Sequence, residues 1–330
     1  MGVDLDAYFG HKAQTLAQDY RSGFVALIGR PNAGKSTLLN QVLGQKVAIV
    51  SDKPQTTRTK IQGIYTDEKM QAIFFDTPGL HKPRHKLGDY MNKAAEVTFG
   101  DVDIICYLVD VSQPFGGGEA HICRQLAETV KPGKPVFLLL NKIDLLQNEQ
   151  GEPLSDEELM AAALRAAAPY LKKLDFACVL PISAKNGLGV EELLAALGRS
   201  LPQGPRYYDD EQLTDQPERQ IMAEIIREKI FLAVREEIPH AVAVSINQYQ
   251  RRDNGMLYLE AMIFVERDSQ KGIIIGKGGA MLRSIGKAAR EEIEGLFGEQ
   301  LYLELRVKVK KDWRDDAWLL KTLGYDPKKL

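Results

Sequence analysis

The chain has 330 residues, 44% of them hydrophobic and 27% charged, with a formal net charge of −2. This length exceeds what one hydrophobic core usually serves, so the sequence predicts two domains of ordinary size. No apolar run reaches the roughly 18 residues that a membrane span requires, and residues 1–20 lack the basic and apolar segments of a signal peptide, which together predict a cytoplasmic protein.

From residue 24 to about residue 200, short apolar runs alternate with longer helical patterns, as in parallel strands joined by crossover helices. The apolar runs do not alternate with polar residues, which is typical of strands covered on both faces. A further strand at 61–66 should form a hairpin with 71–76. The sequence therefore predicts a mixed, mostly parallel sheet with helices on both faces, its strands at 24–29, 61–66, 71–76, 103–110, 134–141 and 176–183.

Residues 202–217 are rich in proline and acidic side chains, which is typical of a linker. Beyond it the patterns predict an α+β domain, with a helix at 219–237, strands at 241–250 and 256–266, a helix after Gly279 and an alternating strand at 301–309. The predicted division is an N-terminal extension at 1–21, an α/β domain at 22–201, a linker at 202–217 and the α+β domain at 218–330.

Residues 29–36 match the phosphate-loop pattern G-x-x-x-x-G-K-S between a predicted strand and a predicted helix. Its glycines let main-chain N–H groups face the phosphates, Lys35 would reach the β- and γ-phosphates, and Ser36 would bind Mg²⁺. The bare pattern arises by chance in roughly one chain per hundred of this length, so alone it is suggestive only. The candidate phosphate-binding residues are Gly29, Arg30, Pro31, Asn32, Ala33, Gly34, Lys35, Ser36, Thr37 and Gly79.

Three further motifs follow, each at the carboxyl end of a predicted strand, where α/β sheets place ligands. They are D-T-P-G at 76–79, N-K-I-D at 141–144 and S-A-K at 183–185. The Asp144 carboxylate can accept hydrogen bonds from the ring N–H and the amine of guanine, and adenine lacks both donors on that edge. The sequence therefore predicts GTP and GDP as ligands, with guanine-binding candidates Asn141, Lys142, Asp144, Ser183, Ala184 and Lys185.

At these motifs the chain resembles the translation-factor-like GTPases, which implies a P-loop GTPase domain with two switch segments. Thr57 stands where that superfamily has a threonine that binds Mg²⁺ only while γ-phosphate is present, and Thr56 is the competing candidate. The expected Mg²⁺ ligands are Ser36, Thr57 and Asp76. The second switch segment comprises Asp76, Thr77, Pro78, Gly79 and Leu80.

Leu80 stands where Ras-like enzymes have the glutamine that orients the attacking water. A leucine cannot orient water, so the sequence predicts a slow GTPase that needs another way to position water and offset charge. Asn32 could hold a K⁺ ion near the phosphates, as its counterparts do in related GTPases. A plain loop asparagine is the equal alternative.

A G-x-x-G loop at 276–279 lies within a basic window, because residues 267–290 contain six basic residues and one acid, a net charge of +5. The loop and the order of elements resemble a type II KH domain, the bacterial form of this RNA-binding fold. A glycine turn beside a solvated basic helix is the alternative. With no stacking aromatics evident near the loop, hydrogen bonds to base edges should carry specificity. The RNA-binding candidates are Ile273, Ile274, Ile275, Gly276, Lys277, Gly278, Gly279, Arg283 and Lys287.

Together these residues resemble the Era family of bacterial GTPases across roughly 22–325, most closely at 30–32, 54–58, 76–81, 91–95, 225–229 and 265–267. The resemblance implies binding to the 3′ end of 16S rRNA and the 30S subunit during maturation, with GTP favouring the RNA-bound state. It also implies peripheral contact with the inner membrane, and no protein oligomer is expected. The alternatives are an RNA-binding adaptor with a structural nucleotide and another RNA-modification GTPase.

Overall fold

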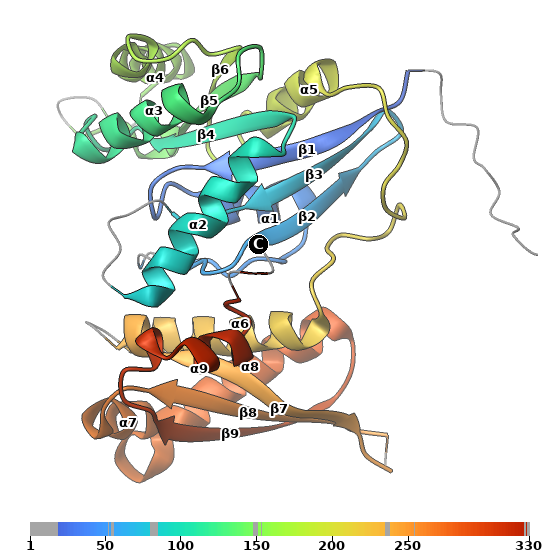
Figure 1. The fold of residues 1–330 in the computed structure, drawn as a ribbon, viewed down its shortest axis with the longest axis vertical. Helices are drawn as coiled ribbons and strands as arrows, with labels where there is room; N and C mark the ends of the chain where they lie inside the picture. Colours follow the sequence, from blue (N-terminus) through green and yellow to red (C-terminus); the bar gives the residue numbers. More distant parts are fainter. Residues whose placement is uncertain are drawn as a thin grey trace, which may run out of the picture.

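Two sheets organise the chain, one in each of two domains that lie against each other (Figure 1). The computed structural model describes residues 19–51, 53, 56–79, 85–147, 151, 152, 154–234, 238–253, 255–326 and 328. Within these ranges no helix is both long enough and apolar enough to cross a bilayer.

The first domain contains a six-stranded sheet in the order β2-β3-β1-β4-β5-β6. Only β2 runs antiparallel to its neighbour, so the predicted mixed, mostly parallel sheet is confirmed. The elements are β1 Arg21–Ile28, α1 Lys35–Leu43, β2 Ile61–Thr66, β3 Met70–Asp76, α2 Lys86–Gly100, β4 Ile104–Asp110, α3 Gly117–Thr129, β5 Val136–Asn141, α4 Asp156–Leu171, β6 Cys178–Ile182 and α5 Val190–Ser200.

Helices cover both faces of this sheet, which explains why its strands are continuously apolar. Along β1, Val25 and Leu27 pack with residues of α1 and α5. Ala26 and Ile28 face the opposite layer, where residues of α2, α3 and α4 complete a second core. Because the parallel strands share one direction, the segments that follow β1, β5 and β6 meet at a single edge of the sheet.

The second domain contains a three-stranded sheet in the order β7-β8-β9, with β9 parallel to β8. Apolar residues of α6 and α8 cover one face of it, and α6 lies between this sheet and the first domain (Figure 1). The elements are α6 Glu218–Ala233, β7 Ala243–Arg251, β8 Leu257–Val265, α7 Asp268–Ile275, α8 Ala280–Phe297, β9 Leu301–Val309 and α9 Ala317–Thr322, with single 3₁₀ turns at Pro239–Ala241, Lys277–Gly279 and Trp313–Asp315.

The helix predicted at 219–237 was extended too far, because α6 ends at Ala233 and Val234 is already extended, with φ −116° and ψ 163°. Residues 235–237 lie outside the described part of the chain. Lys53 of the first domain donates hydrogen bonds to the carbonyls of Phe231 and Val234. A contact from another domain, which no local pattern records, therefore satisfies carbonyl groups at the end of this helix.

The predicted linker is fastened to the first domain over much of its length. Gln71 of β3 is fully buried, and its amide oxygen accepts hydrogen bonds from the N–H groups of Tyr207 (2.7 Å) and Tyr208 (3.0 Å). Its amide nitrogen donates to the Tyr208 carbonyl at 2.9 Å. Further along, the Leu213 carbonyl accepts from Ile64 of β2 at 2.8 Å. The segment between the domains therefore extends the sheet edge.

We expect Gln71→Leu to lower the free energy of unfolding by about 3 kcal/mol, because two N–H groups and one carbonyl of the linker lose their partners inside the protein. Urea unfolding followed by circular dichroism measures this change. Gln203→Leu is the matched control, since Gln203 is exposed, and its effect should stay within about 0.5 kcal/mol. Equal unfolding midpoints for the two variants would contradict the buried role of Gln71.

Candidate nucleotide site and RNA groove

The phosphate loop between β1 and α1 contains residues with positive φ angles, a backbone conformation that few residue types adopt readily. Gly34 has φ 101°, and a Cβ there would lie 2.2 Å from the Asn141 side-chain nitrogen. Asn32 is left-handed, with φ 63°, a conformation that asparagine tolerates better than most residues. A Cβ on Gly79 would lie 2.5 Å from the Pro31 nitrogen. The D-T-P-G segment is therefore held directly against the phosphate loop.

A cavity of about 440 Å³ opens over this loop. Most of the predicted phosphate and guanine residues line it, together with Ile49, Val50, Ser51 and Leu145, which the sequence did not single out because no motif contains them. Its lining is Pro31, Asn32, Gly34, Lys35, Ser36, Thr37, Ile49, Val50, Ser51, Thr56, Thr57, Gly79, Asn141, Lys142, Asp144, Leu145, Ala184 and Lys185.

Lys35 is a buried cation at the floor of this cavity. Its Nζ donates to the carbonyl oxygens of Gly29 (3.2 Å) and Arg30 (3.0 Å). Burial lowers the pKa of Lys35, and the negative charge of Asp76 partly offsets that effect. A phosphate in the cavity would add negative charge beside this ammonium group and so favour its charged form further.

Three oxygen-bearing side chains meet beside Lys35, and they are the three predicted Mg²⁺ ligands. Ser36 Oγ lies 2.5 Å from Asp76 Oδ2 and 2.8 Å from Thr57 Oγ1, and Thr57 Oγ1 lies 3.3 Å from Asp76 Oδ2. Burial raises the pKa of the Asp76 carboxyl, which Lys35 and the two hydroxyls oppose. Asp76 Oδ1 is buried without a hydrogen-bond partner among the described residues. A hard cation prefers such a set of oxygens.

The same contacts distinguish the two switch threonines. Thr57 Oγ1 points to Ser36 and Asp76, whereas Thr56 Oγ1 donates to the Lys53 carbonyl at 2.6 Å. The geometry therefore favours Thr57 over Thr56 as the candidate Mg²⁺ ligand.

At the far end of the cavity, the guanine candidates form a connected set. Ser183 Oγ donates to Asp144 Oδ1 at 2.6 Å and so fixes the orientation of that carboxylate. Asn141 is buried and makes two hydrogen bonds within the protein: its nitrogen donates to the Ala33 carbonyl (2.7 Å), and its oxygen accepts from the Ala184 N–H (2.9 Å). Asn141 thus ties the phosphate loop to the S-A-K segment. Lys142 pairs with Asp110 at 2.6 Å.

Some of the predicted residues have side chains outside the cavity. Arg30 points away from the cavity and pairs with Glu119 of α3 at 3.2 Å, so only its main chain faces Lys35. Thr77 is buried, and its hydroxyl donates to the Leu27 carbonyl at 2.8 Å. Pro78 lies between Thr77 and Gly79 and is buried with them. Leu80, on which the prediction of slow hydrolysis rests, lies outside the described residues.

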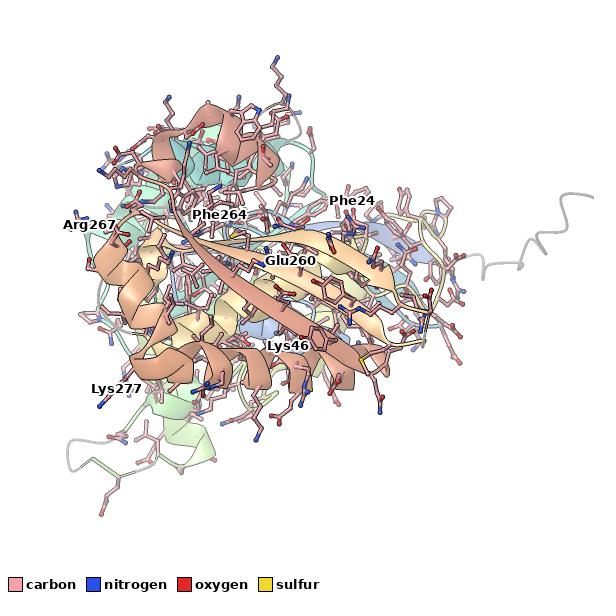
Figure 2. The ribbon with its side chains drawn as sticks, turned by 90° about the horizontal axis from the view of Figure 1, so that it is seen from below. Phe24, Lys46, Glu260, Phe264, Arg267 and Lys277 are labelled. Carbon is pink, nitrogen blue, oxygen red and sulfur yellow. The ribbon has the colours of Figure 1, made fainter. Side chains whose placement is uncertain are left out.

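A second groove, of about 700 Å³, lies between α8 and β9. It begins at Gly279, and Arg283, Lys287 and Arg290 supply its positive charge. Gly278 and Gly279 both have left-handed backbones, with φ 58° and 79°. The face opposite the helices bears Glu260, and Lys277 lies at the outer edge of the domain (Figure 2).

The prediction that three consecutive isoleucines bind RNA together needs correction. Residues 273–275 belong to α7, and a helix spreads three consecutive side chains around its axis. Ile274 is fully buried in the core, Ile273 is half exposed, and neither they nor Ile275 line the groove.

The expectation that no stacking aromatic lies near the G-x-x-G loop stays a prediction. An exposed aromatic side chain does lie at the start of β9, on the sheet face opposite the helices, because it alternates with Leu301 and Leu303, which pack toward α6 and α8. This residue is Tyr302, which is 49% exposed. Its ring stacks on Tyr258 with centroids 5.9 Å apart, and the Arg252 guanidinium lies 4.9 Å from its centroid. Only the pairing of β8 with β9 brings these residues together, so the sequence carried no local signal for them.

We expect Asp144→Asn to lower GTP affinity by about 100-fold, or ~3 kcal/mol, because an amide N–H₂ would face the two donors of guanine. Xanthosine triphosphate, which has an oxygen in place of the amine, should then bind the variant better than GTP. Titration with fluorescent nucleotides measures both affinities. Ser183→Ala, which removes only the orienting hydroxyl, should cost about tenfold. Unchanged GTP affinity in Asp144→Asn would show that guanine is read elsewhere.

Family models match both parts of the chain. Residues 24–142 match the model described as 50S ribosome-binding GTPase, and residues 237–314 match the KH domain model. The second match agrees with a sheet covered on one face by α6 and α8 and with the G-x-x-G loop between α7 and α8. The fold predicted for both domains is therefore confirmed.

Two curated relatives are similar over nearly their whole length. GTPase Era of Heliobacterium modesticaldum is 50% identical over 308 residues, which cover 93% of this chain and 98% of the relative. GTPase Era of Lacticaseibacillus paracasei is 50% identical over 312 residues, covering 94% and 99%.

Two solved structures have the same two-domain fold. Era of Aquifex aeolicus bound to GDP·AlF₄⁻ is 36% identical, with a TM-score of 0.84 over 93% of this chain and 99% of that one. Era in complex with MgGDPNP and nucleotides 1506–1542 of 16S ribosomal RNA is 35% identical, with the same TM-score and coverage. Ordered nucleotide motifs, a KH domain and these full-length relatives agree, and the chain belongs to the Era family of GTPases.

Proposed function

We propose that this chain is a GTP-hydrolysing switch that binds the 3′ end of 16S rRNA through its KH domain and assists maturation of the 30S subunit. The basic groove between α8 and β9 carries the proposal, since it starts at the G-x-x-G loop and lies in the same chain as a guanine-nucleotide cavity. The relative solved with MgGDPNP and a 16S rRNA fragment holds both ligands at once.

In the proposed reaction, this chain binds and orients the nucleotide. Lys35 and the N–H groups of the phosphate loop hold the phosphates, and Asp144 holds the base. Mg²⁺, held by Ser36, Thr57 and Asp76, would neutralise charge that develops on the phosphate oxygens. The short distances among these three side chains support this ligand set.

Hydrolysis is proposed to be slow in the free protein and to change when RNA or the ribosome binds. Leu80 supplies no group that can orient the attacking water. The rate of hydrolysis would therefore depend on RNA or ribosome binding, which would order the nucleotide site. We also propose that the protein acts in the cytoplasm, as its composition and N-terminal residues predict, and without forming an oligomer. Peripheral contact with the inner membrane stays a prediction of the family resemblance.

The test is GTP turnover with and without an oligonucleotide of the 16S rRNA 3′ end. We expect the oligonucleotide to bind and to change turnover. An RNA-binding adaptor with a structural nucleotide would bind the oligonucleotide with negligible turnover, and a GTPase of another pathway would not bind it. Either result would overturn the proposal.

Gly278 offers the cleanest variant of the RNA groove. A Cβ there meets nothing within 4 Å, whereas a Cβ on Gly276 would lie 2.7 Å from Met281. Asp and Asn both tolerate the left-handed backbone of Gly278, and they differ only in charge. We expect Gly278→Asp to weaken oligonucleotide binding about tenfold, or ~1.4 kcal/mol, relative to Gly278→Asn, as measured by fluorescence anisotropy. Equal affinities would place the phosphates away from this loop.

We further propose that Asn32 helps to hold a K⁺ ion beside the phosphates. Asn32 lines the cavity, which supports this proposal. Its backbone is left-handed, a conformation that glycine adopts without strain, so Asn32→Gly is a suitable test variant. Turnover should be about tenfold faster in K⁺ than in Na⁺ buffer, which corresponds to ~1.4 kcal/mol in the barrier. Asn32→Gly should lose this difference while still binding GTP. Equal turnover of the parent protein in the two buffers would remove the K⁺ proposal.

A further inference from the structure

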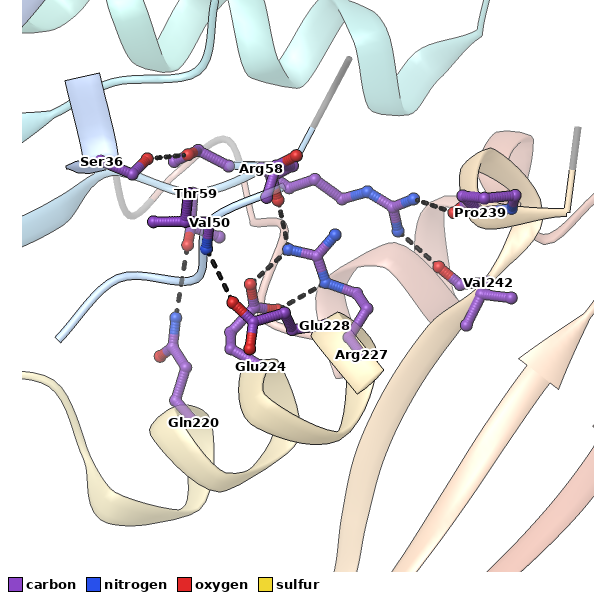
Figure 3. Close-up of polar contacts among 12 residues, drawn as sticks. Ser36, Val50, Arg58, Thr59, Gln220, Glu224, Arg227, Glu228, Pro239 and Val242 are labelled. Carbon is purple, nitrogen blue, oxygen red and sulfur yellow. Dashed lines mark hydrogen bonds and ion pairs between the residues drawn. The ribbon is translucent and has the colours of Figure 1, made fainter. Parts of the chain in front are cut away.

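The KH domain contacts the loop that carries Thr57 on both sides of that residue. Figure 3 shows Arg58 and Arg227, the two side chains that make these contacts. Before it, the main-chain carbonyl of Thr56 accepts a hydrogen bond from Arg227 of α6. After it, the side chain of Arg58 extends into the KH domain and donates to carbonyls there. Thr57 itself points the other way, with its hydroxyl 2.8 Å from Ser36.

Arg58 is a buried cation, 2% exposed, that binds main-chain carbonyls of the other domain. Its guanidinium donates to Val242 (2.6 Å), Pro239 (3.2 Å) and His240 (3.2 Å), all between α6 and β7. The aromatic rings of Phe231 and Trp313 lie 6.0 and 5.7 Å from it. A buried cation without hydrogen-bond partners is costly in free energy. The loop therefore cannot move away from the carbonyls of residues 239–242 unless the Arg58 side chain also leaves its buried position.

Arg227 of α6 makes the second contact with the loop, at Thr56. Its side chain is 1% exposed, and its Nε donates to Glu224 Oε1 at 2.9 Å. The same guanidinium donates hydrogen bonds to both Glu224 and the Thr56 carbonyl. The Glu224 carboxylate therefore orients the Arg227 guanidinium that binds the loop at Thr56.

The contacts of Arg58 continue toward the RNA groove through paired strands. The carbonyl of Val242 directly precedes β7, and Ala243 of β7 pairs with Phe264 of β8. Phe264 in turn pairs with Lys308 of β9, the strand that lines the groove, and α7 with its glycine loop follows β8 within three residues. The 239–242 segment is therefore connected through two strand pairs to the strand whose first residues line the groove.

We propose that Arg58 and Arg227 are positioning residues that couple the position of Thr57 to the position of the KH domain, so that the two change together between two arrangements. The inference rests on the proposed function and assigns its coupling to two side chains. When γ-phosphate and Mg²⁺ hold Thr57, the loop holds the 239–242 segment. When Thr57 is released, the segment moves with the loop. Linkage then requires that RNA on the KH domain favour the GTP-bound arrangement by the same factor.

The experiment compares oligonucleotide affinity of the full-length protein saturated with Mg²⁺ and either GDPNP or GDP. The probe is the 16S rRNA 3′-end oligonucleotide, and the ratio of the two dissociation constants is the readout. We expect a ratio on the order of 5 to 150 for the parent protein, the usual range of coupling between sites. In Arg58→Met, which keeps the length of the side chain and removes its donors, the ratio should fall close to one, with nucleotide affinity retained.

Two further variants separate positioning from general loosening of the interface. Arg58→Lys keeps the charge and part of the carbonyl contact, and should retain an intermediate ratio even if Arg58→Met folds poorly. Lys46→Met is the matched control, because Lys46 also crosses the interface, 2.5 Å from Glu228 and 2.6 Å from Glu292, without touching residues 56–58. It should keep the parent ratio. Arg227→Met should behave as Arg58→Met does.

The outcomes separate this inference from the function beneath it. A ratio unchanged in Arg58→Met and Arg58→Lys would overturn the inference while the switch function stands. An equal loss in Lys46→Met would also overturn it, since the coupling would then belong to the whole interface. If the parent protein binds no oligonucleotide, or binds it equally in both nucleotide states, the proposed switch itself fails.

Discussion

Burial of the Arg58 charge between the domains is the constraint on which the two-domain arrangement depends. Removing one partner of a buried charge typically costs about 3–5 kcal/mol, so separating the domains around an intact Arg58 is expensive. The carbonyls that bind it belong to a segment between α6 and β7. The end of α6 and the start of the KH sheet are thereby fixed to a loop of the nucleotide site. Charge pairs at the rim of the interface, such as Lys46 with Glu292, are more exposed and contribute less.

This constraint explains why the first domain could be predicted more completely than its contact with the second. Motifs such as N-K-I-D lie at strand termini, and the parallel sheet brings those termini to one edge, so local patterns were enough to assemble Lys35, Gly79 and Asp144 around one cavity. The hydroxyl chemistry of Thr57 was also readable from its position. What each motif residue does was less accessible, since Asn141 turned out to hold the two loops together.

The residues that sequence reasoning missed share a physical cause. The burial of Ile274 depends on how its helix is rotated relative to its neighbours, and an apolar triplet does not specify that rotation. Arg58 and Arg227 depend on a contact across more than 160 residues of chain, where an arginine looks like any surface charge. Alternation and spacing report local geometry, so contacts between domains are where they fail.

The absence of a water-orienting glutamine at position 80 and the contacts of the KH domain beside Thr57 are related features. A GTPase with its own glutamine carries its timing within the nucleotide site. With Leu80 at that position, our proposal assigns the timing to the order of the rest of the site, and in particular to Thr57 as the Mg²⁺ ligand whose order would vary. The KH domain contacts the residues on both sides of Thr57. In this proposal, an RNA that stabilises one position of the KH domain would act on the candidate Mg²⁺ ligand set without approaching the phosphates.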